Sequence, residues 1–457
     1  MKPHGADANK HFRCASRSRP RFADVASPWK SCALCVTMLS TPVSTLREID
    51  MVLDGRSCSP ILEHEIRTPT GALVYVESPD VLRVGRSTVL LGSPSFATNN
   101  DGSPLSVASE GTATIALAGV VLGGTDSIAL IPSPLINRWV RSPRGLVSRA
   151  GTFDMLWMPE PFQIGDPAGL SATTWTNGKW SRAISVDTSL TAFRWTPNNI
   201  FRVAQSSNDS PWLLVGRAFS SALGSSRFLR RGARWSIEPF SAVSEPYPSA
   251  VFDVDGTILT SFVDYGSPDG NAVFVRRADS RGRIIGSPVR VSSPGSGAAY
   301  NPVLAKGEAE WSVIWSTMGA SPRLAASRSF DGGQTWQRPV TVGVDVDAMT
   351  ATSDAKGNVH VIAQVRTDDG ATKPAYYAWS NGHWSKRWES SAKSFGTPTI
   401  TQVGTDSLFV TWADPSRASG PRFLATRYWV HSVDCLALLD TTVSRRSPLG
   451  SLNRSRR

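Results

Sequence analysis

The chain has 457 residues, of which 40% are hydrophobic and 19% charged, and it is rich in glycine (37), proline (31) and tryptophan (16). This composition favours many short strands joined by tight turns and argues against a coiled coil or a helical bundle. No stretch approaches the roughly 18 apolar residues of a membrane-spanning helix, so we expect no membrane span.

The formal net charge of +11 raises the question of a nucleic-acid partner. Basic residues are concentrated in residues 1–50 and 431–457, whereas the body between them is nearly balanced in charge. Basic tails around a balanced body are typical of solvated segments, whereas a nucleic-acid site gathers Lys and Arg on one face. We therefore expect no nucleic-acid partner.

The two ends of the chain differ from its body. Residues 1–60 are rich in Ser, Arg and Cys without periodicity, and we expect them to be disordered or non-native. Cys32 and Cys35 form a CxxC, but no second ligand pair follows at matching spacing, so we expect no metal and no cofactor. The apolar patch at 33–39 is too short for a clear signal peptide, which leaves secretion an open alternative. Residues 431–457 are expected to form a basic disordered tail.

Between these ends, residues 61–430 are expected to form one domain, and the chain repeats itself between about residue 75 and residue 430. A turn followed by Trp or a bulky apolar residue recurs at steps of 55, 50, 51, 48 and 45 residues. Each period also opens with a Pro-containing apolar run and holds a central stretch of alternating apolar residues, which indicates about four strands. The recurring positions are Trp180, Trp235, Ile285, Trp336, Trp384 and Trp429.

Repeated four-stranded antiparallel units of this length are typical of a β-propeller, an all-β fold in which the sheets close radially. Six units are legible, so we favour six blades. A seventh, degenerate unit at about 75–133 is the alternative.

One unit carries a motif with a clear physical reading, Ser329-Phe330-Asp331-Gly332-Gly333-Gln334-Thr335-Trp336. An Asp at a turn accepts backbone N–H bonds, two glycines permit positive φ, and the Trp packs between sheets. The string matches the Asp box, S-x-D-x-G-x-T-W, and resembles the repeat of the sialidase-like (BNR-repeat) propellers. In that family the box is a structural hairpin at the blade periphery, so Ser329, Asp331, Gly333, Thr335 and Trp336 are expected to be structural.

The resemblance also implies a carbohydrate or glycoconjugate partner and glycoside hydrolysis. Sialidases clamp the substrate carboxylate with three arginines and use a Tyr activated by a Glu as nucleophile, with an Asp as acid/base. The first arginine lies in an Arg-Ile-Pro string, and this chain has Leu130-Ile131-Pro132 in the nearest text. This departure leaves a divergent glycoside hydrolase and a carbohydrate-binding protein as alternatives.

We expect a central pocket lined by the strands that open each unit and by the loops after the second strands. Tyr247 and Glu245 are close enough to form a nucleophile pair, and Asp264 is a candidate acid. Arg323 and Arg422 occupy equivalent places in two repeats. The candidates are Glu245, Tyr247, Asp264 and Tyr300 for catalysis, and Arg323, Arg422 and Asp414 for substrate binding.

Two other interpretations are weighed against this one. Asp253-Val254-Asp255-Gly256-Thr257 matches the D-x-D-G-T string of haloacid-dehalogenase-type phosphatases, but strand-like text flanks it where helices would be needed, so we expect a turn. The second interpretation is a non-catalytic propeller that serves as an interaction platform for a protein or ligand, with the candidate residues solvated in loops or packed in the core.

Overall fold

The chain divides into two units, Met1–Glu48 and Ile49–Arg457, and the computed structural model describes parts of the second only. The described residues are those of the strands given below and 61–66, 152–159, 179–187, 249–268, 270–307, 310–319, 321–354, 356–380, 382–403, 406–415 and 425–436.

Among the described strands, seven sheets have four strands or more, and neighbouring strands in them pair antiparallel. Sheet 1 contains β5 (Asp80–Val84), β6 (Ser87–Gly92), β8 (Ala116–Val121) and β9 (Ile128–Ile131). Sheet 2 contains β10 (Val140–Val147), β11 (Phe153–Pro159), β12 (Leu170–Thr176), β13 (Lys179–Trp180) and β14 (Ile184–Asp187). Sheet 3 contains β15 (Phe201–Gln205), β16 (Pro211–Val215), β17 (Ser225–Arg231) and β18 (Trp235–Ser244).

The later sheets follow the same order. Sheet 4 contains β19 (Ser249–Phe252), β20 (Ile258–Asp264), β21 (Ala272–Ala278) and β22 (Ile284–Arg290). Sheet 5 contains β23 (Ala298–Lys306), β24 (Trp311–Met318), β25 (Arg323–Ser329) and β26 (Val340–Val344). Sheet 6 contains β27 (Val346–Ser353), β28 (Val359–Arg366), β29 (Thr372–Ser380) and β30 (His383–Glu389). Sheet 7 contains β31 (Phe395–Val403), β32 (Ser407–Asp414), β33 (Ala425–Ser432) and the early strand β3 (His64–Glu65).

These sheets are the blades of a β-propeller, which confirms the predicted fold class. The first strand of each sheet lies against the first strand of the next, and β31 lies against β5, so the series closes on itself. The sequence favoured six units, whereas seven sheets are present. Sheet 1 falls within the region named as the alternative, 75–133, and it has no Trp at the marker position, which is occupied by Trp in five of the six other repeats.

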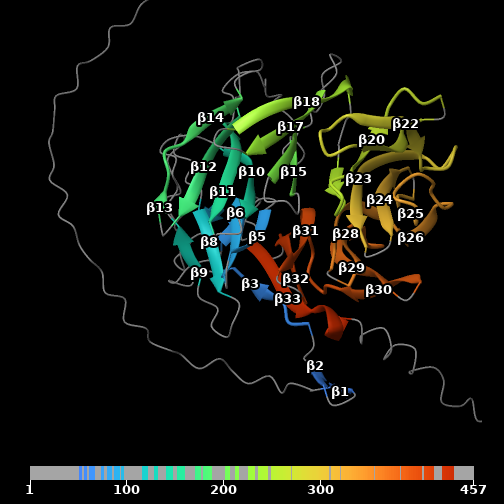
Figure 1. The fold of residues 1–457 in the computed structure, drawn as a ribbon. Coiled ribbons are helices and arrows are strands. Elements are labelled where there is room, and N and C mark those ends of the chain that lie inside the picture. The colour runs from blue at the N-terminus through green and yellow to red at the C-terminus, as the bar shows by residue number, and fades with distance from the viewer. Residues whose placement is uncertain are drawn as a thin grey trace, which may run out of the picture. The chain divides into compact units, whose positions relative to one another are not determined.

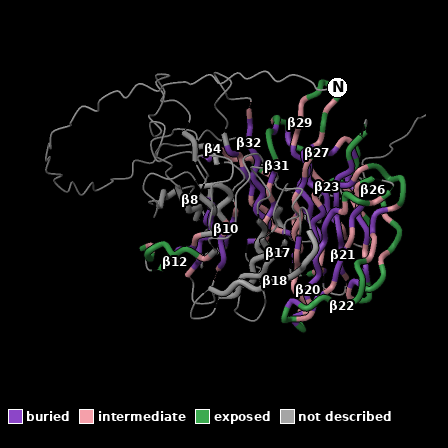
Figure 2. The backbone as a smooth tube through the Cα atoms, turned by 90° about the horizontal axis from the view of Figure 1, so that it is seen from above, coloured by how far each residue is buried: buried purple, intermediate pink, exposed green. Residues whose placement is uncertain are grey.

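The burial of a strand depends on its position in the sheet. The second strands β20, β24 and β28 are almost continuously buried, whereas the fourth strands β22 and β26 are mainly exposed. Figure 2 shows this gradient as purple inner strands and green outer ones. Period-two alternation is therefore weak in the second strands, because both of their faces pack against neighbouring blades.

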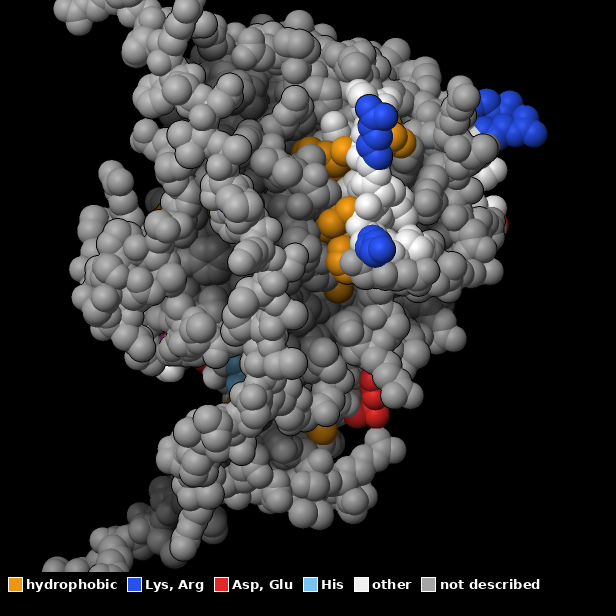
Figure 3. Space-filling view, turned by 90° about the vertical axis from the view of Figure 1, so that its left-hand side faces the viewer, with side chains coloured by type: hydrophobic (Ala, Val, Ile, Leu, Met, Phe, Trp, Pro, Cys, Tyr) orange, Lys and Arg blue, Asp and Glu red, His pale blue; other side chains and the backbone are white. Residues whose placement is uncertain are grey.

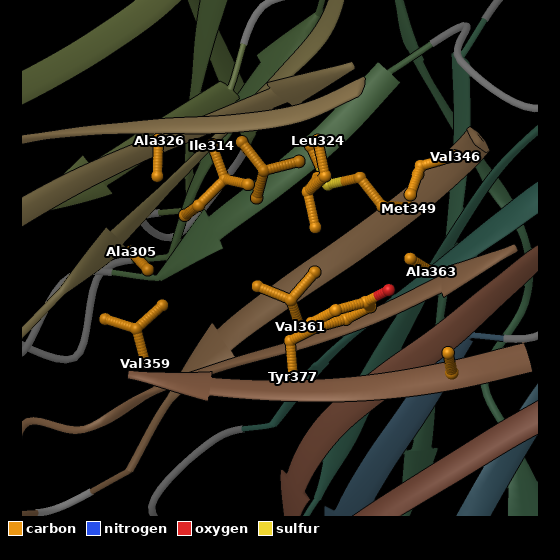
Figure 4. Close-up of a cluster of buried hydrophobic side chains, with 12 residues drawn as sticks. Ala305, Ile314, Leu324, Ala326, Val346, Met349, Val359, Val361, Ala363 and Tyr377 are labelled. Carbon is orange, nitrogen blue, oxygen red and sulfur yellow. The ribbon is translucent and has the colours of Figure 1, made fainter. Parts of the chain in front are cut away.

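The contact between sheets 5 and 6 illustrates the core of the fold. Figure 4 shows Ile314 and Leu324 of sheet 5 facing Met349 and Val361 of sheet 6, with Tyr377 packed beside Val361. All five side chains are buried in one cluster. At roughly 25 cal/mol for each Å² of apolar surface removed from water, such contacts between blades supply most of the favourable folding energy.

An N-terminal strand completes the last blade. β3 pairs with β33, and the Ile66 N–H donates to the carbonyl oxygen of Thr426 (2.9 Å). Arg427 of β33 holds this joint, because its guanidinium forms ion pairs with Asp414 (2.5 Å), Glu63 (3.2 Å) and Glu65 (3.4 Å). Asp414 is completely buried. Sheet 7, coloured partly blue and partly red in Figure 1, is thus assembled from both ends of the propeller sequence.

The motif at 329–336 forms the expected hairpin between β25 and β26. The Asp331 carboxylate accepts the backbone N–H groups of Gln334 (3.0 Å) and Thr335 (2.9 Å) and the Thr335 hydroxyl (2.6 Å). These hydrogen bonds hold the pKa of Asp331 well below its usual range. Gly333 has φ +81°, and a Cβ there would lie 2.4 Å from Leu259 Cδ2 of the preceding sheet. The hairpin therefore joins two blades.

Several features differ from the boundaries expected from sequence. Two short strands, β1 (Met51–Leu53) and β2 (Arg56–Cys58), form a hairpin within residues expected to be disordered. β33 ends at Ser432 and residues 433–436 are helical, so regular structure continues past residue 430. Cys435 is disulfide-bonded.

The D-x-D-G-T string forms the expected turn between β19 and β20, with Gly256 at φ 84°. No helix in the described part of the chain is long and apolar enough to cross a membrane.

Replacing Arg427 with Ala tests the closure of the ring. The substitution leaves the buried Asp414 carboxylate without its ion-pair partner, and breaking a buried pair in this way costs about 3–5 kcal/mol of unfolding free energy. Urea denaturation measures the change. The control is Arg283→Ala, which breaks an exposed pair with Asp279 and should lower the unfolding free energy far less. Equal effects of the two substitutions would contradict the account.

Gly333→Ala tests the contact between hairpin and blade, with Gly332→Ala as its match. Both glycines have positive φ, but a Cβ at Gly332 meets nothing within 4 Å. We expect Gly333→Ala to lower the unfolding free energy by about 1–3 kcal/mol more than Gly332→Ala, because only the former overpacks Leu259. Thermal melts of both variants provide the comparison, and identical melting temperatures would show that the hairpin does not press on sheet 4.

Candidate functional site

Register shifts interrupt four of the first strands near their beginnings, and others lie between third and fourth strands. Register shifts occur between Arg141 and Arg144 in β10, Tyr300 and Val303 in β23, Val346 and Ala348 in β27, and Phe395 and Thr399 in β31. Such bulges redirect side chains and are common beside active sites. Because all sheets share one strand order, these beginnings lie at one end of the ring. We call this end, with the ends of the paired second strands, the rim.

Backbone conformation marks the same rim. Asn301 (φ 48°) and Asp345 (φ 57°) are the only non-glycine residues with positive φ in the described part of the chain. They lie at the beginnings of neighbouring first strands, and Gly396 (φ 70°) occupies the corresponding place in β31. Uncommon φ values persist where the surrounding structure imposes them, and they cluster at functional sites. The rim is therefore the candidate functional site.

Two residues predicted to be catalytic lie at this rim, in neighbouring sheets. Asp264 ends β20, and Tyr300 lies in β23 of the next sheet just before its register shift. The two segments are joined because the Ala299 N–H donates to the Asn271 carbonyl (3.1 Å), one residue before the partner of Asp264 in β21. Asp264 also accepts the Gly266 N–H (2.9 Å). Both side chains are half-buried and so remain reachable.

Sequence reasoning missed a second polar group at the rim. The Arg366 guanidinium pairs with Asp347 (2.6 Å), and the Arg366 N–H donates to the Asp345 carbonyl (2.7 Å). Arg366 ends β28 and Asp347 lies in the register shift of β27. The available signal was the string Asp345-Val346-Asp347 at a strand beginning, which breaks the apolar pattern seen in the other repeats.

The remaining predicted residues are more scattered. Arg323 begins β25, its side chain is exposed, and its N–H donates to the Thr317 hydroxyl (3.0 Å). Asp414 ends β32 at the rim, and its buried carboxylate is paired with Arg427. Glu245, Tyr247 and Arg422 lie outside the described residues.

Exposed apolar side chains accompany the polar ones. Tyr265 (44% exposed) follows β20, Met318 (61%) ends β24, and Phe395 (60%) begins β31. All three lie at the rim in different sheets. Aromatic rings exposed beside polar groups can stack on the apolar faces of sugar rings. On the face shown in Figure 3, the Lys and Arg side chains that are coloured lie separately from one another, and hydrophobic side chains lie near them.

Side-chain oxygens also bridge successive first strands. The Gly145 N–H donates to Asp80 (2.7 Å), the Leu304 N–H to Ser249 (3.2 Å), and the Ile400 N–H to Thr350 (3.1 Å). Each donor lies two residues after a proline, respectively Pro143, Pro302 and Pro398. The register shift beside each proline interrupts the ladder, so an oxygen of the preceding sheet takes the N–H. We call these contacts the inter-blade bridges.

Asp80 is the one ionisable acceptor among these three bridges. Burial raises the pKa of Asp80, while Arg144 and the N–H groups of Gly145 and Val81 oppose that rise. The net result is a carboxyl group that keeps its proton at a higher pH than an exposed Asp does. Acid/base chemistry needs such a group.

A second polar network lies away from the rim. The His360 ring bridges the Asp354 carboxylate (3.0 Å) and the Tyr376 hydroxyl (2.7 Å). All three side chains are buried, and burial raises the pKa of Tyr376 far above its usual value. With Tyr376 completely inaccessible and packed against Trp429, this network holds sheets 6 and 7 together. In the described part of the chain, no group of three or more His, Cys, Asp or Glu could hold a metal ion.

No family model and no curated protein matches the sequence. Among solved structures, an ulvan lyase from a new polysaccharide lyase family has a TM-score of 0.51 at 10% identity, covering 81% of this chain and 96% of its own. An α-L-arabinanase from Penicillium chrysogenum has a TM-score of 0.42 at 14% identity, covering 65% and 94%. A sialidase from Trypanosoma rangeli has a TM-score of 0.41 at 11% identity, covering 84% and 60%. At these identities the ulvan lyase supports the fold alone.

The raised pKa of Asp80 predicts a pH-dependent stability. Because the folded state favours the protonated carboxyl, its contribution is complete below the ordinary pKa of 3.8 and is lost as pH rises through the raised value. Asp80→Asn keeps an oxygen for the Gly145 N–H without the charge. We expect this variant to melt above the unchanged protein at pH 7, and the difference to vanish near pH 3. A difference that is constant with pH would contradict the shift.

Proposed function

We propose that the protein is a carbohydrate-active β-propeller that processes a glycoside at the rim. The observation that supports this proposal is that Asp264 and Tyr300 lie at the same end of neighbouring sheets, with Asn301, whose φ is positive, next to Tyr300 in a register shift of a first strand. The half-buried Asp264 carboxyl group is suited to proton transfer. The Tyr300 phenol is suited to proton transfer or to attack at an anomeric carbon.

The partner class is a carbohydrate. The likeness of the 329–336 hairpin to the Asp box of the BNR-repeat propellers suggests kinship with sialidases, and the ulvan lyase of similar fold was solved bound to a sulfated, uronic-acid-containing saccharide. Exposed Tyr265 and Phe395 supply apolar surfaces on which sugar rings stack. Arg323 and Arg422 are proposed to bind polar or acidic groups of the substrate.

The residue roles follow from chemistry. Tyr247 with Glu245 is proposed as a nucleophile pair, because a phenol needs a base to attack at neutral pH. Asp264 supplies a second carboxyl group, as glycoside hydrolysis requires. Tyr300 completes the set from the first strand of the next sheet.

A non-catalytic glycan-binding platform is the second candidate. The observation that favours it is that the chain has Leu130-Ile131-Pro132 where sialidases have Arg-Ile-Pro, so the first clamp arginine is replaced by an apolar residue. Met318 and Phe395 are exposed at the same rim and suit binding without turnover.

Turnover on defined glycans tests the proposal. The full chain is incubated with ulvan, linear arabinan and a fluorogenic sialoside, and new reducing ends or fluorophore are measured. We expect turnover of at least one substrate, and a loss of about 100-fold or more in Asp264→Asn and Tyr300→Phe. The control is Asp279→Asn, an Asp in a turn at the opposite end of sheet 4.

The outcomes separate the two functions. Turnover that survives in both rim variants would contradict these residue roles. Saturable binding of one of these glycans without turnover would establish the platform. If the protein shows no turnover and no binding of these glycans, a carbohydrate function at this rim is contradicted.

A further inference from the structure

We propose that Asp80, the first residue of β5, is the proton donor of the rim, acting as the acid that protonates the leaving oxygen of the glycoside. This inference rests on the proposed function and names a residue that the sequence did not single out. It is carried by the comparison of the three inter-blade bridges, in which Asp80 takes the place that a neutral hydroxyl takes elsewhere.

The bridge itself does not need a carboxyl group. Ser249 and Thr350 accept equivalent N–H groups with hydroxyl oxygens, and each of these bridges spans neighbouring first strands as the Asp80 bridge does. A hydroxyl at residue 80 would satisfy the Gly145 N–H at no cost in buried charge. The acidic group at this one bridge therefore has a use beyond joining sheets 1 and 2.

Asp80 lies just inside the rim. It begins β5, as Ser249 begins β19, whereas the third bridge acceptor, Thr350, is the fifth residue of β27 and lies past the register shift of that strand. The next two residues are buried on opposite sides, Val81 against sheet 7 and Leu82 against sheet 2, so the packed interior starts directly below Asp80. Asp80 itself is half-buried. One oxygen, Oδ2, accepts the Gly145 N–H and fixes the carboxyl group in place.

The charges around Asp80 suit an acid that recovers its proton. Arg144 of β10 is the charged group beside it, and the neighbouring strands β6 and β31 have no ionisable side chain. Burial favours the protonated form before reaction, while Arg144 limits the cost of the carboxylate formed after proton transfer. A stability cost at a functional residue is common, because sites are selected for chemistry and not for folding.

The proposed step balances in atoms and charge. The Asp80 proton passes to the glycosidic oxygen as the bond between that oxygen and the anomeric carbon breaks, and the leaving sugar departs as an alcohol. In the same step the phenol nucleophile proposed above loses its proton to its base and bonds to the anomeric carbon. Water then replaces the phenol: its hydroxyl goes to the anomeric carbon, its remaining proton returns to Asp80, and the base returns the phenol's proton. A second rim carboxylate, Asp264, stabilises the positive charge that develops on the sugar.

Two substitutions separate the acid from the bridge. Asp80→Asn and Asp80→Thr both keep an oxygen for the Gly145 N–H, and Thr reproduces the acceptor of the Thr350 bridge. The matched control is Thr350→Val, which removes a bridge without touching Asp80. Thermal melts and pH–rate profiles are measured for all three variants and the unchanged protein, on whichever of ulvan, linear arabinan or the sialoside is turned over.

We expect both Asp80 variants to fold and to lose about 100-fold or more in kcat/KM, with loss of the alkaline limb of the pH–rate profile. Thr350→Val should melt lower and keep its pH–rate profile. Turnover that persists in Asp80→Asn with an unchanged alkaline limb would overturn the assignment of Asp80 alone. Absence of turnover in the unchanged protein would overturn the proposed function and this assignment together.

Discussion

Closure of the ring by Arg427 is the constraint on which the rest of the structure depends. One guanidinium gathers Asp414 from β32 with Glu63 and Glu65 from the N-terminal strand, and so joins segments more than 360 residues apart. Without this joint the last blade lacks its fourth strand, and the hydrophobic cluster that joins Val81 and Leu90 to Val403 and Phe409 is left to hold sheets 1 and 7 together. A buried ion pair is costly to assemble, but it is specific about its partners, which closure requires.

The rim inherits its rigidity from that closure. Each bulge beside a proline frees a backbone N–H, and the preceding blade supplies an oxygen to take it, so the shape of one blade's first strand depends on its neighbour. Asn301 and Asp345, with positive φ, lie in the same part of the ring. A site built from strand beginnings in different blades keeps its geometry only while the ring is closed.

The sequence predicted much of the fold because propeller repeats are local. Turn chemistry and a Trp mark most blades, and the 329–336 hairpin forms as its letters indicate. Sheet 1 lacks the marker Trp, and β3 joins a blade from the far end of the chain, which no local pattern reveals. At the rim, Asp264 and Tyr300 follow from their places in the repeat. Asp80 and Arg366 depend on contacts between strands, and these appear only in three dimensions.

The most direct test of carbohydrate binding at the rim is to measure backbone hydrogen–deuterium exchange with and without bound oligosaccharide. Oligosaccharides of ulvan and of arabinan serve as probes, and the full chain is used. We expect protection at the beginnings of the first strands, in residues 298–303, 345–348 and 395–399, with no change at the 329–336 hairpin. Protection confined to that hairpin, or to the outer strands β22 and β26, would contradict carbohydrate binding at the rim.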